Sequence, residues 1–307
     1  MLPPLFNPSN DLALAANVGN YTPPRNIRRM EADLRSIARF WDEGPWGWSL
    51  NTRQRYLKMG VSPHELPDKA WLEHHRNLSS RATACDYIRR LLHADDWHGR
   101  LVGQEMTMHT TAPGHASSPV ILKSPWSSSG KGILVAQDGT ITPDMEARIL
   151  RILRTQGSIL SDRFYGDKAV DFAMEFFVHP EGEVQFLGYS VFQTDDSGQY
   201  GGQLVAGQAE QLQRIGADEG LLRSLVAYHQ AHLPLLGYTG PLGIDMMRLA
   251  DGRLHPVVEI NLRRNMGILA LTLYERGLTA PQALTPPSSG GFQMVIDRGM
   301  LRILRSG

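Results

Sequence analysis

Oxygen-bearing side chains occur on two consecutive apolar segments near the C-terminal end of the sequence. Asp245 lies in the first segment, and Glu259 and Asn261 lie two residues apart in the second. Side chains two apart in a strand point to the same face, and residues 250–253, Ala-Asp-Gly-Arg, predict a hairpin turn that pairs the two strands. Asp245 can therefore join the other two side chains. Such carboxylate and amide oxygens suit Mg²⁺ or Mn²⁺, with nucleotide phosphates as further ligands.

The same carboxylates could also be ordinary surface groups, since acidic residues at strand ends and Asp-Gly turns are common. Asp251 is expected to serve only the turn. Glu259 is harder to explain in this way, because residues 257–262 are otherwise largely apolar, and a carboxylate in such a run is normally paired or bound to a metal. Two cations that follow, Arg263 and Arg264, are candidates to bind an anion.

A second segment could hold phosphate groups. An apolar strand over 120–123 ends in Lys123, a loop of small residues over 127–132 follows, and a second apolar strand begins at residue 133. Small side chains would let backbone N–H groups approach phosphate oxygens, and Lys123 would supply charge. The spacing is not that of a Walker loop, and a flexible hairpin is the alternative. The loop residues expected at the phosphates are Ser127, Ser128, Ser129, Gly130 and Lys131.

In this order, the motifs resemble those of the ATP-grasp superfamily: a strand lysine, a glycine-rich hairpin loop, an acidic hinge strand, an Asp strand and a Glu-x-Asn-x-Arg strand. The resemblance covers about residues 80–275. It implies an α/β (α+β) ATP-grasp fold, in which two α+β lobes clasp the nucleotide. It also implies ATP and Mg²⁺ (or Mn²⁺) as cofactors. The resemblance implies Asp245, Glu259 and Asn261 as metal ligands, and Lys123 and Arg263 as catalytic cations.

The activity implied by the resemblance is that of an ATP- and Mg²⁺-dependent ligase. A substrate carboxylate would attack the γ-phosphoryl group to give an acyl-phosphate, and an amine or similar nucleophile would then displace phosphate. A phosphotransferase (kinase) acting on a small molecule and a non-catalytic ATP-binding regulator are the alternatives. The expected partners are small-molecule carboxylate and amine substrates, with a homodimer among the possible assemblies.

Two positions depart from the family pattern. Many members carry a hinge Glu that holds the ribose hydroxyls, whereas here Asp162 would have to serve with a shorter side chain. In the D-alanine ligase branch an Arg precedes the metal Asp by two residues, and this sequence has Gly243 there. Asp171 and Glu175 lie where family members often place polar groups toward the nucleotide; a salt bridge with Lys168 is the alternative.

The resemblance also predicts how the chain is divided. Residues 1–77 are expected to form a small α/β pre-ATP-grasp domain. The ATP-grasp domain is expected over 78–307, with lobes of about 78–160 and 161–307.

The stretch 6–15, Phe-Asn-Pro-Ser-Asn-Asp-Leu-Ala-Leu-Ala, resembles the start of an uncharacterised group of bacterial ATP-grasp proteins. Helix capping or an Asx turn is the default interpretation of Asn7, Asn10 and Asp11. The alternative is that these residues face a substrate cleft.

The 307-residue chain has 31 basic and 31 acidic residues, so its formal net charge is zero. Without a basic block, nothing predicts binding to nucleic acid or to an anionic membrane. No apolar stretch reaches the length that crosses a bilayer, and no signal peptide is evident. The one cysteine, Cys85, is expected to be a buried structural thiol. We therefore expect a cytoplasmic protein.

Hydrophobic periodicity predicts the remaining elements. Helices are expected over 26–41, 54–59, 82–93, 143–154 and 221–236. Residues 78–81 carry a helix-start signal. Strands are expected over 172–177 and 184–192, with one final apolar strand after residue 291.

Several histidines, His74, His75, His109 and His115, lack partners at metal-binding spacing. We expect them to be surface or hydrogen-bonded loop residues. The segment 200–203, Tyr-Gly-Gly-Gln, is expected either to form a turn or to bring backbone close to a substrate.

Overall fold

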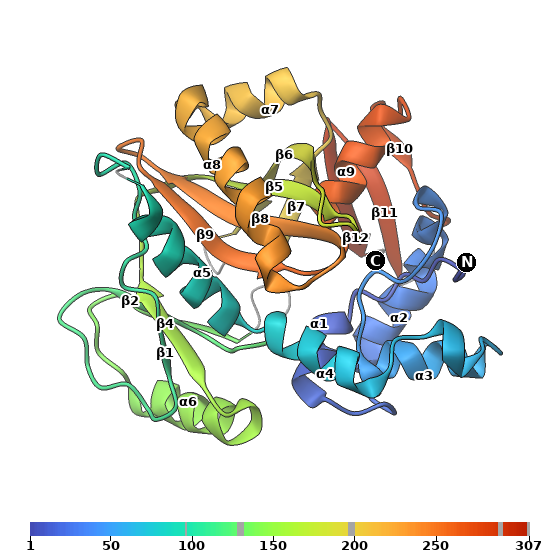
Figure 1. Cartoon of the computed structure of the whole chain (residues 1–307), viewed down its shortest axis with the longest axis horizontal. Coiled ribbons are helices and arrows are strands. Elements are labelled where there is room, and N and C mark those ends of the chain that lie inside the picture. Colours follow the sequence, from blue (N-terminus) through green and yellow to red (C-terminus); the bar gives the residue numbers. More distant parts are fainter. Residues whose placement is uncertain (96, 128–131, 196–199, 288–290, 306–307) are drawn as a thin grey trace.

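The computed structural model describes residues 1–95, 97–127, 132–195, 200–287 and 291–305. These residues form a mixed α+β structure with two antiparallel sheets (Figure 1). The expected α+β architecture with two sheet-containing parts is therefore confirmed. None of the described helices has the length and apolar character needed to span a bilayer.

The larger sheet contains eight described strands, and all neighbouring strands are antiparallel. In their order across the sheet they are β10 (Gln282–Ala283), β11 (Phe292–Asp297), β12 (Met300–Arg305), β7 (Tyr200–Leu204), β6 (Val184–Thr194), β5 (Lys168–Val178), β8 (Gly240–Leu249) and β9 (Leu254–Asn261). Helices α7 (Gln208–Ile215) and α8 (Glu219–His232) cover one face of this sheet (Figure 1).

The central strand β5 shows why the two faces of this sheet differ. Phe172, Met174 and Phe176 alternate along it, are buried, and belong to the main hydrophobic core with α7 and α8. Asp171, before Phe172, and Glu175, between Met174 and Phe176, belong to the other set of alternate positions and point to the opposite face. The alternation thus gives the sheet one apolar face and one face that can carry polar groups.

The smaller sheet has four described strands in the order β1-β4-β2-β3, and helix α6 (Pro143–Gln156) packs on it. The strands are β1 (Thr107–His109), β4 (Ile159–Arg163), β2 (Val120–Lys123) and β3 (Ile133–Ala136). The lobe boundary that we placed near residue 160 falls within β4, so the smaller sheet continues to Arg163. Helix α5 (Arg81–Ala94) lies between this sheet and β9 (Figure 1).

The N-terminal part is mainly helical. Its helical elements are α1 (Asn10–Ala16), α2 (Arg25–Leu34), the 3₁₀ helix η1 (Arg35–Phe40), α3 (Leu50–Lys58), the 3₁₀ helix η2 (Pro63–Glu65) and α4 (Lys69–Leu78). Where we expected a small α/β domain, the only described β-pairing in residues 1–77 is the isolated bridge between Leu5 and Pro45. Apolar residues of this part share a core with β11, β12 and α9 (Met266–Glu275).

Most predicted elements are present, with shifted ends. The predicted helix over 26–41 is an α-helix only to Leu34 and then tightens into η1. The predicted helix over 221–236 ends at His232, and residues 233–236 form a 3₁₀ turn. The single final strand is in fact the pair β11 and β12, because Gly299, with φ of +75°, permits a tight turn between them. Helices α4, α7 and α9 were not predicted.

Candidate active site

The hairpin of β8 and β9 brings the three expected metal ligands together. Asp245 lies opposite Glu259, and Gly243 lies opposite Asn261. Residues directly opposite in an antiparallel pair share a face, as do residues two apart in one strand. Asp245, Glu259 and Asn261 therefore lie on one face of the sheet; we call them the carboxylate cluster. Asp251 serves the turn as expected, since its carboxylate accepts from the backbone N–H of its neighbour two residues on, at 3.0 Å.

The two carboxylates of the cluster lie close enough to influence each other. Asn261 Nδ2 donates to Asp245 Oδ2 at 3.0 Å. Burial raises the pKa of Asp245 well above its ordinary value, and the charges of Glu259 and Glu175 raise it further. Carboxylates that face each other repel, and a cation between them removes that repulsion. The cluster therefore has both the charge and the oxygen donors that Mg²⁺ or Mn²⁺ requires.

The small number of protein donors indicates what else would bind the metal. Among the described residues, no group of three or more His, Cys, Asp or Glu side chains is arranged to hold a metal ion. The cluster offers two carboxylates and one amide. Since Mg²⁺ is commonly held by one or two carboxylates together with substrate phosphates, the residues fit a metal ion that binds with a nucleotide.

Lys123, at the end of β2, lies near the carboxylate cluster. Its side chain is buried, and burial lowers the pKa of its ammonium group. The carboxylates of Asp162 and Glu259 act in the opposite direction, whereas the charge of Arg81 adds to the lowering. The Lys123 side chain is thus buried where the charges of Asp162 and Glu259 act on it.

The small-residue loop begins and ends as the sequence predicts. The backbone N–H of Ser124 donates to the carbonyl of Gly132 at 3.0 Å and closes the base of the loop. Gly132 has φ of +88°, and a Cβ atom there would lie 2.4 Å from Ser124 Oγ, so the position requires glycine. Ser127 is buried at the start of the loop. The other expected loop residues, Ser128, Ser129, Gly130 and Lys131, lie outside the described part of the chain.

Arg81, the first residue of α5, joins this loop to the carboxylate cluster. Its Nη2 forms an ion pair with Glu259 Oε2 at 2.8 Å. Its Nη1 donates to Ser127 Oγ at 2.8 Å and also to the carbonyl of Ser124. We took residues 78–81 only as a helix start, so Arg81 is a site residue that the sequence patterns missed. A single arginine after a capping serine gives no signal of the partners that folding brings to it.

Arg263 and Arg264 follow β9 and contact different parts of the molecule. Arg263 lies beside the carboxylate cluster, where its Nη2 donates to Asn261 Oδ1 at 2.8 Å. Burial would lower the pKa of the Arg263 guanidinium, but the carboxylate of Asp11 more than offsets this and raises it. Arg264 instead donates to the backbone carbonyl of Glu43 at 3.2 Å. Of the two arginines, Arg263 is the one placed at the cluster.

Asp162, which we expected to hold a ribose, is bound within the protein, and its role toward a nucleotide remains a prediction. Asp162 lies on β4 and is 2% exposed. Its Oδ2 lies 3.1 Å from His255 Nε2, and its Oδ1 accepts from the backbone N–H of Arg163 at 2.8 Å. Burial alone would raise the pKa of Asp162, but the hydrogen bond and charge of His255 bring it below its ordinary value. Both oxygens therefore have partners inside the protein.

Asp171 shares a face with the carboxylate cluster, because Ala173, two residues along β5, lies opposite Asp245. Its carboxylate pairs with Lys168 Nζ at 2.6 Å and accepts from Thr194 Oγ1 at 2.6 Å. The salt bridge that we considered as an alternative is thus present. A role for Asp171 toward the nucleotide remains a prediction.

Glu175 is buried on the same face and has two hydrogen-bond donors. Ser190 Oγ and Asn265 Nδ2 each donate to it at 2.7 Å. Burial raises the pKa of Glu175 to about 7, although these two hydrogen bonds act against the shift. A Cβ atom at Gly243 would lie 2.4 Å from Glu175 Oε2, and one at Gly267 would lie 2.0 Å from Oε1. Gly243, at the position where the D-alanine ligase branch has arginine, therefore leaves room for the side chains of Glu175 and Asn265.

The segment 6–15 reaches this site, but not through helix caps. Asn7 is buried and donates to the carbonyl of Gly47 at 2.9 Å. Asn10 is also buried and, with its amide oriented for hydrogen bonding, donates to the same carbonyl at 3.1 Å. Within the described residues, the residue before α1 makes no side-chain capping bond. The capping interpretation is therefore wrong, and both asparagines fasten the start of α1 to the segment around Gly47.

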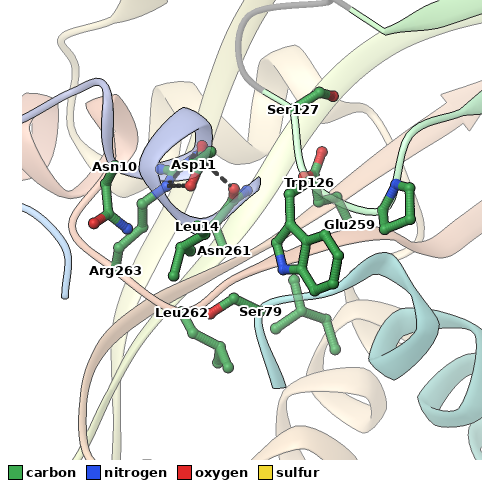
Figure 2. A pocket seen from close by; sticks show the side chains of 12 residues that line it. Asn10, Asp11, Leu14, Ser79, Trp126, Ser127, Glu259, Asn261, Leu262 and Arg263 are labelled. Atoms are coloured by element: carbon green, nitrogen blue, oxygen red, sulfur yellow. Dashed lines mark hydrogen bonds and ion pairs between the residues drawn. The ribbon is translucent and has the colours of Figure 1, made fainter. Parts of the chain in front are cut away.

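Asp11 lies in a cleft beside the carboxylate cluster (Figure 2). Four parts of the chain meet there: α1, the link between α4 and α5, the residues that lead into the small-residue loop, and the end of β9 with the residues that follow it. The cleft is lined by Asn10, Asp11, Leu14, Ser79, Pro125, Trp126, Ser127, Glu259, Ile260, Asn261, Leu262 and Arg263. Of the two interpretations of Asp11, a helix-capping or turn residue and a residue that faces a cleft, the structure therefore favours the second.

Other expectations from the sequence have mixed outcomes. His75 is buried in α4, stacked against Trp71 and Tyr238 with ring centroids 5.0 and 5.6 Å away, so the expectation of a surface or loop residue is wrong. Burial lowers its pKa to about 4.

Cys85 is buried as expected, and burial raises the pKa of its thiol to about 12. Residues 200–203 belong to strand β7 and do not form a turn.

Comparison with known proteins gives distant structural similarities. No protein-family model matches the sequence, and no curated protein matches it. Among solved structures, the chain is similar to N5-carboxyaminoimidazole synthetase from Staphylococcus aureus complexed with ADP, at 12% identity and a TM-score of 0.39, over 64% of this chain and 52% of that one. The chain therefore matches about half the length of that synthetase.

Two further solved structures show similarity of the same order. Biotin carboxylase from Campylobacter jejuni, in its β,γ-ATP complex, is 13% identical with a TM-score of 0.48, over 84% of this chain and 69% of that one. L-amino acid ligase from Bacillus licheniformis is 15% identical with a TM-score of 0.44, over 69% of this chain and 48% of that one. Both similarities are distant and assign no activity to this chain.

Proposed function

We propose that the protein is an ATP- and Mg²⁺-dependent ligase that joins a carboxylate to an amine or a similar nucleophile through an acyl-phosphate. The observation that carries the proposal is the meeting of opposite charges at one site. Asp245 and Glu259 offer oxygens for a divalent cation, while Arg81 and Lys123 bring positive charge from α5 and β2. A metal-bound polyphosphate needs both kinds of group. An ordinary cluster of surface carboxylates would not require two buried cations beside it.

In this proposal, the carboxylate cluster holds the metal ion. Bound there with ATP, Mg²⁺ would draw negative charge from the phosphate oxygens. Lys123 and the small-residue loop, which begins at Ser127, would bind the polyphosphate. Arg81 already bridges Ser127 and Glu259, so it would turn from the carboxylate toward the phosphates as the metal ion enters.

Two displacement steps would complete the proposed reaction. In the first, a carboxylate oxygen of the substrate bonds to the γ-phosphorus, and the bond from that phosphorus to the bridging oxygen breaks, which releases ADP. In the second, the amine nitrogen bonds to the acyl carbon and loses a proton, and the bond from that carbon to the phosphate-bearing oxygen breaks. No side chain forms a covalent bond, so the residues act through position and charge. Arg263, beside Asn261, would neutralise charge on the transferred phosphoryl group.

The proposal is tested by ADP release in the presence of Mg²⁺, screened over panels of carboxylates and amines. A ligase should release ADP and free phosphate only with a matching pair, and ³¹P-NMR should show no phosphorylated end product. Glu259→Gln should lower this turnover at least 100-fold, because it removes a metal-binding charge, whereas Glu181→Gln at an exposed turn should not.

Three outcomes would contradict parts of the proposal. A phosphorylated product without free phosphate would indicate a kinase. Binding of ATP without metal-dependent ADP release over all substrate pairs would indicate a regulator. Undiminished turnover in Glu259→Gln would show that the carboxylate cluster is not the metal site.

A further inference from the structure

An unbroken chain of hydrogen bonds runs from the N-terminal segment to the carboxylate cluster. Asp11 Oδ1 accepts from Arg263 Nε at 2.9 Å, and Asp11 Oδ2 accepts from Arg263 Nη2 at 2.8 Å. The same Nη2 donates to Asn261 Oδ1 at 2.8 Å, and Asn261 Nδ2 donates to Asp245 Oδ2 at 3.0 Å. Figure 2 shows Asp11, Arg263 and Asn261 joined in this way. The chain connects residues that are far apart in sequence.

Asp11 determines where the Arg263 guanidinium lies. The two contacts form a forked pair, which fixes both the position and the plane of the guanidinium. Both side chains are largely buried, with 17% of Arg263 and 14% of Asp11 exposed. The charges of Glu259 and Asp245 also act on Arg263. Without Asp11, these carboxylates would be the strongest remaining attraction for the guanidinium, which would then compete with a metal ion for them.

Asp11 is itself held rigidly. Asn7 donates to the carbonyl of Gly47 at 2.9 Å and to Thr52 Oγ1 at 3.1 Å. Ser9 Oγ donates to a carboxylate oxygen of Glu31. These bonds fasten the residues around the start of α1, so the Asp11 carboxylate is presented at a fixed point in the cleft.

We propose that Asp11 is a positioning residue of the active site: it holds Arg263 against Asn261 and away from the carboxylates of Asp245 and Glu259, so that these carboxylates can take up a metal ion. The N-terminal segment then contributes directly to the site. This inference rests on the proposed function, because it assumes that the cluster binds a divalent cation.

The test measures binding of Mn²⁺ by EPR, with and without a non-hydrolysable ATP analogue. The variants are Asp11→Asn, Arg263→Gln and the double variant, with Asp42→Asn as the control, since Asp42 is an exposed carboxylate in the same N-terminal part. We expect Asp11→Asn to weaken Mn²⁺ binding at least tenfold and Asp42→Asn to change it less than twofold. Because Asp11 acts through Arg263, the double variant should bind Mn²⁺ like Arg263→Gln alone.

The outcomes separate this inference from the proposed function. If the unmodified protein binds no Mn²⁺ with the analogue, both are overturned. If it binds Mn²⁺ and Asp11→Asn binds equally well, or if the two substitutions act additively, only the role of Asp11 is overturned. A lowered melting temperature of Asp11→Asn with unchanged Mn²⁺ affinity would likewise leave Asp11 with a purely structural role.

Discussion

Replacing Arg81 with Met should change the affinities for metal and for nucleotide in opposite directions. In the free protein, the Arg81 guanidinium lies 2.8 Å from Glu259 and so occupies one oxygen of a carboxylate that we expect to bind the metal. Methionine fills much of the same space without the charge. The substitution should therefore free Glu259 for a metal ion, and at the same time remove a cation from the phosphate site.

The size of the change in each affinity follows from how exposed Arg81 and Glu259 are. Arg81 is 6% exposed and Glu259 is 27% exposed, so solvent screens the ion pair in part. Such a pair contributes about 1 kcal/mol, and its loss should strengthen binding of Mn²⁺ alone by about fivefold. A charged hydrogen bond contributes about 1.5 to 3 kcal/mol, so binding of an Mg²⁺-nucleotide should weaken roughly 10- to 150-fold.

Isothermal titration calorimetry measures both affinities, with Mn²⁺ alone and with a non-hydrolysable ATP analogue in excess Mg²⁺. Arg89→Met is the matched control, because Arg89 lies on the same helix with 60% of its side chain exposed. Changes of the same sign in both affinities, or changes no larger than those of the control, would refute the reasoning.

Two further predictions concern the buried carboxylate behind the cluster. Gly243→Ala should lower the free energy of unfolding by about 1 to 3 kcal/mol, because the added Cβ would lie 2.2 Å from Asn265 Nδ2. Urea unfolding measures this change, with Gly114→Ala as the control, since a Cβ at Gly114 would meet nothing within 4 Å. Equal stabilities of the two variants would contradict the prediction. Since the pKa of Glu175 is raised to about 7 in the folded protein, the stability that its proton provides is fully present below the ordinary value of 4.5 and is lost as the pH rises through 7. The free energy of unfolding, relative to that of Glu175→Gln, should therefore fall by roughly 2 to 4 kcal/mol over this range, and a difference that does not vary with pH would refute the assignment.

The parts of the site that sequence could predict are those set by local rules. Side chains alternate with a period of two along a strand, and the Asp-Gly turn pairs the two strands. These rules predict that Asp245, Glu259 and Asn261 share one face, and in the structure they lie on one face. The same rules predicted strands β2 and β3 on either side of the small-residue loop. In each case the residues that must meet lie within a few positions of one another or on adjacent strands.

The contacts that sequence could not predict join residues that are far apart in the chain. Arg81 meets Glu259 across 178 positions, and Asp11 meets Arg263 across 252. Neither residue belongs to a periodic pattern, so nothing local indicates its partner. The contact of Asp162 with His255 could not be predicted for the same reason, because only folding brings the two side chains together and buries them.

The central claim, that Asp245 and Glu259 hold a divalent cation together with a nucleotide, is tested most directly by Mn²⁺ EPR with a non-hydrolysable ATP analogue. We expect the unmodified protein to bind the Mn²⁺-nucleotide. The variant carrying both Asp245→Asn and Glu259→Gln should bind it at least tenfold more weakly, with its circular dichroism unchanged. Equal affinity in the two proteins would contradict the account.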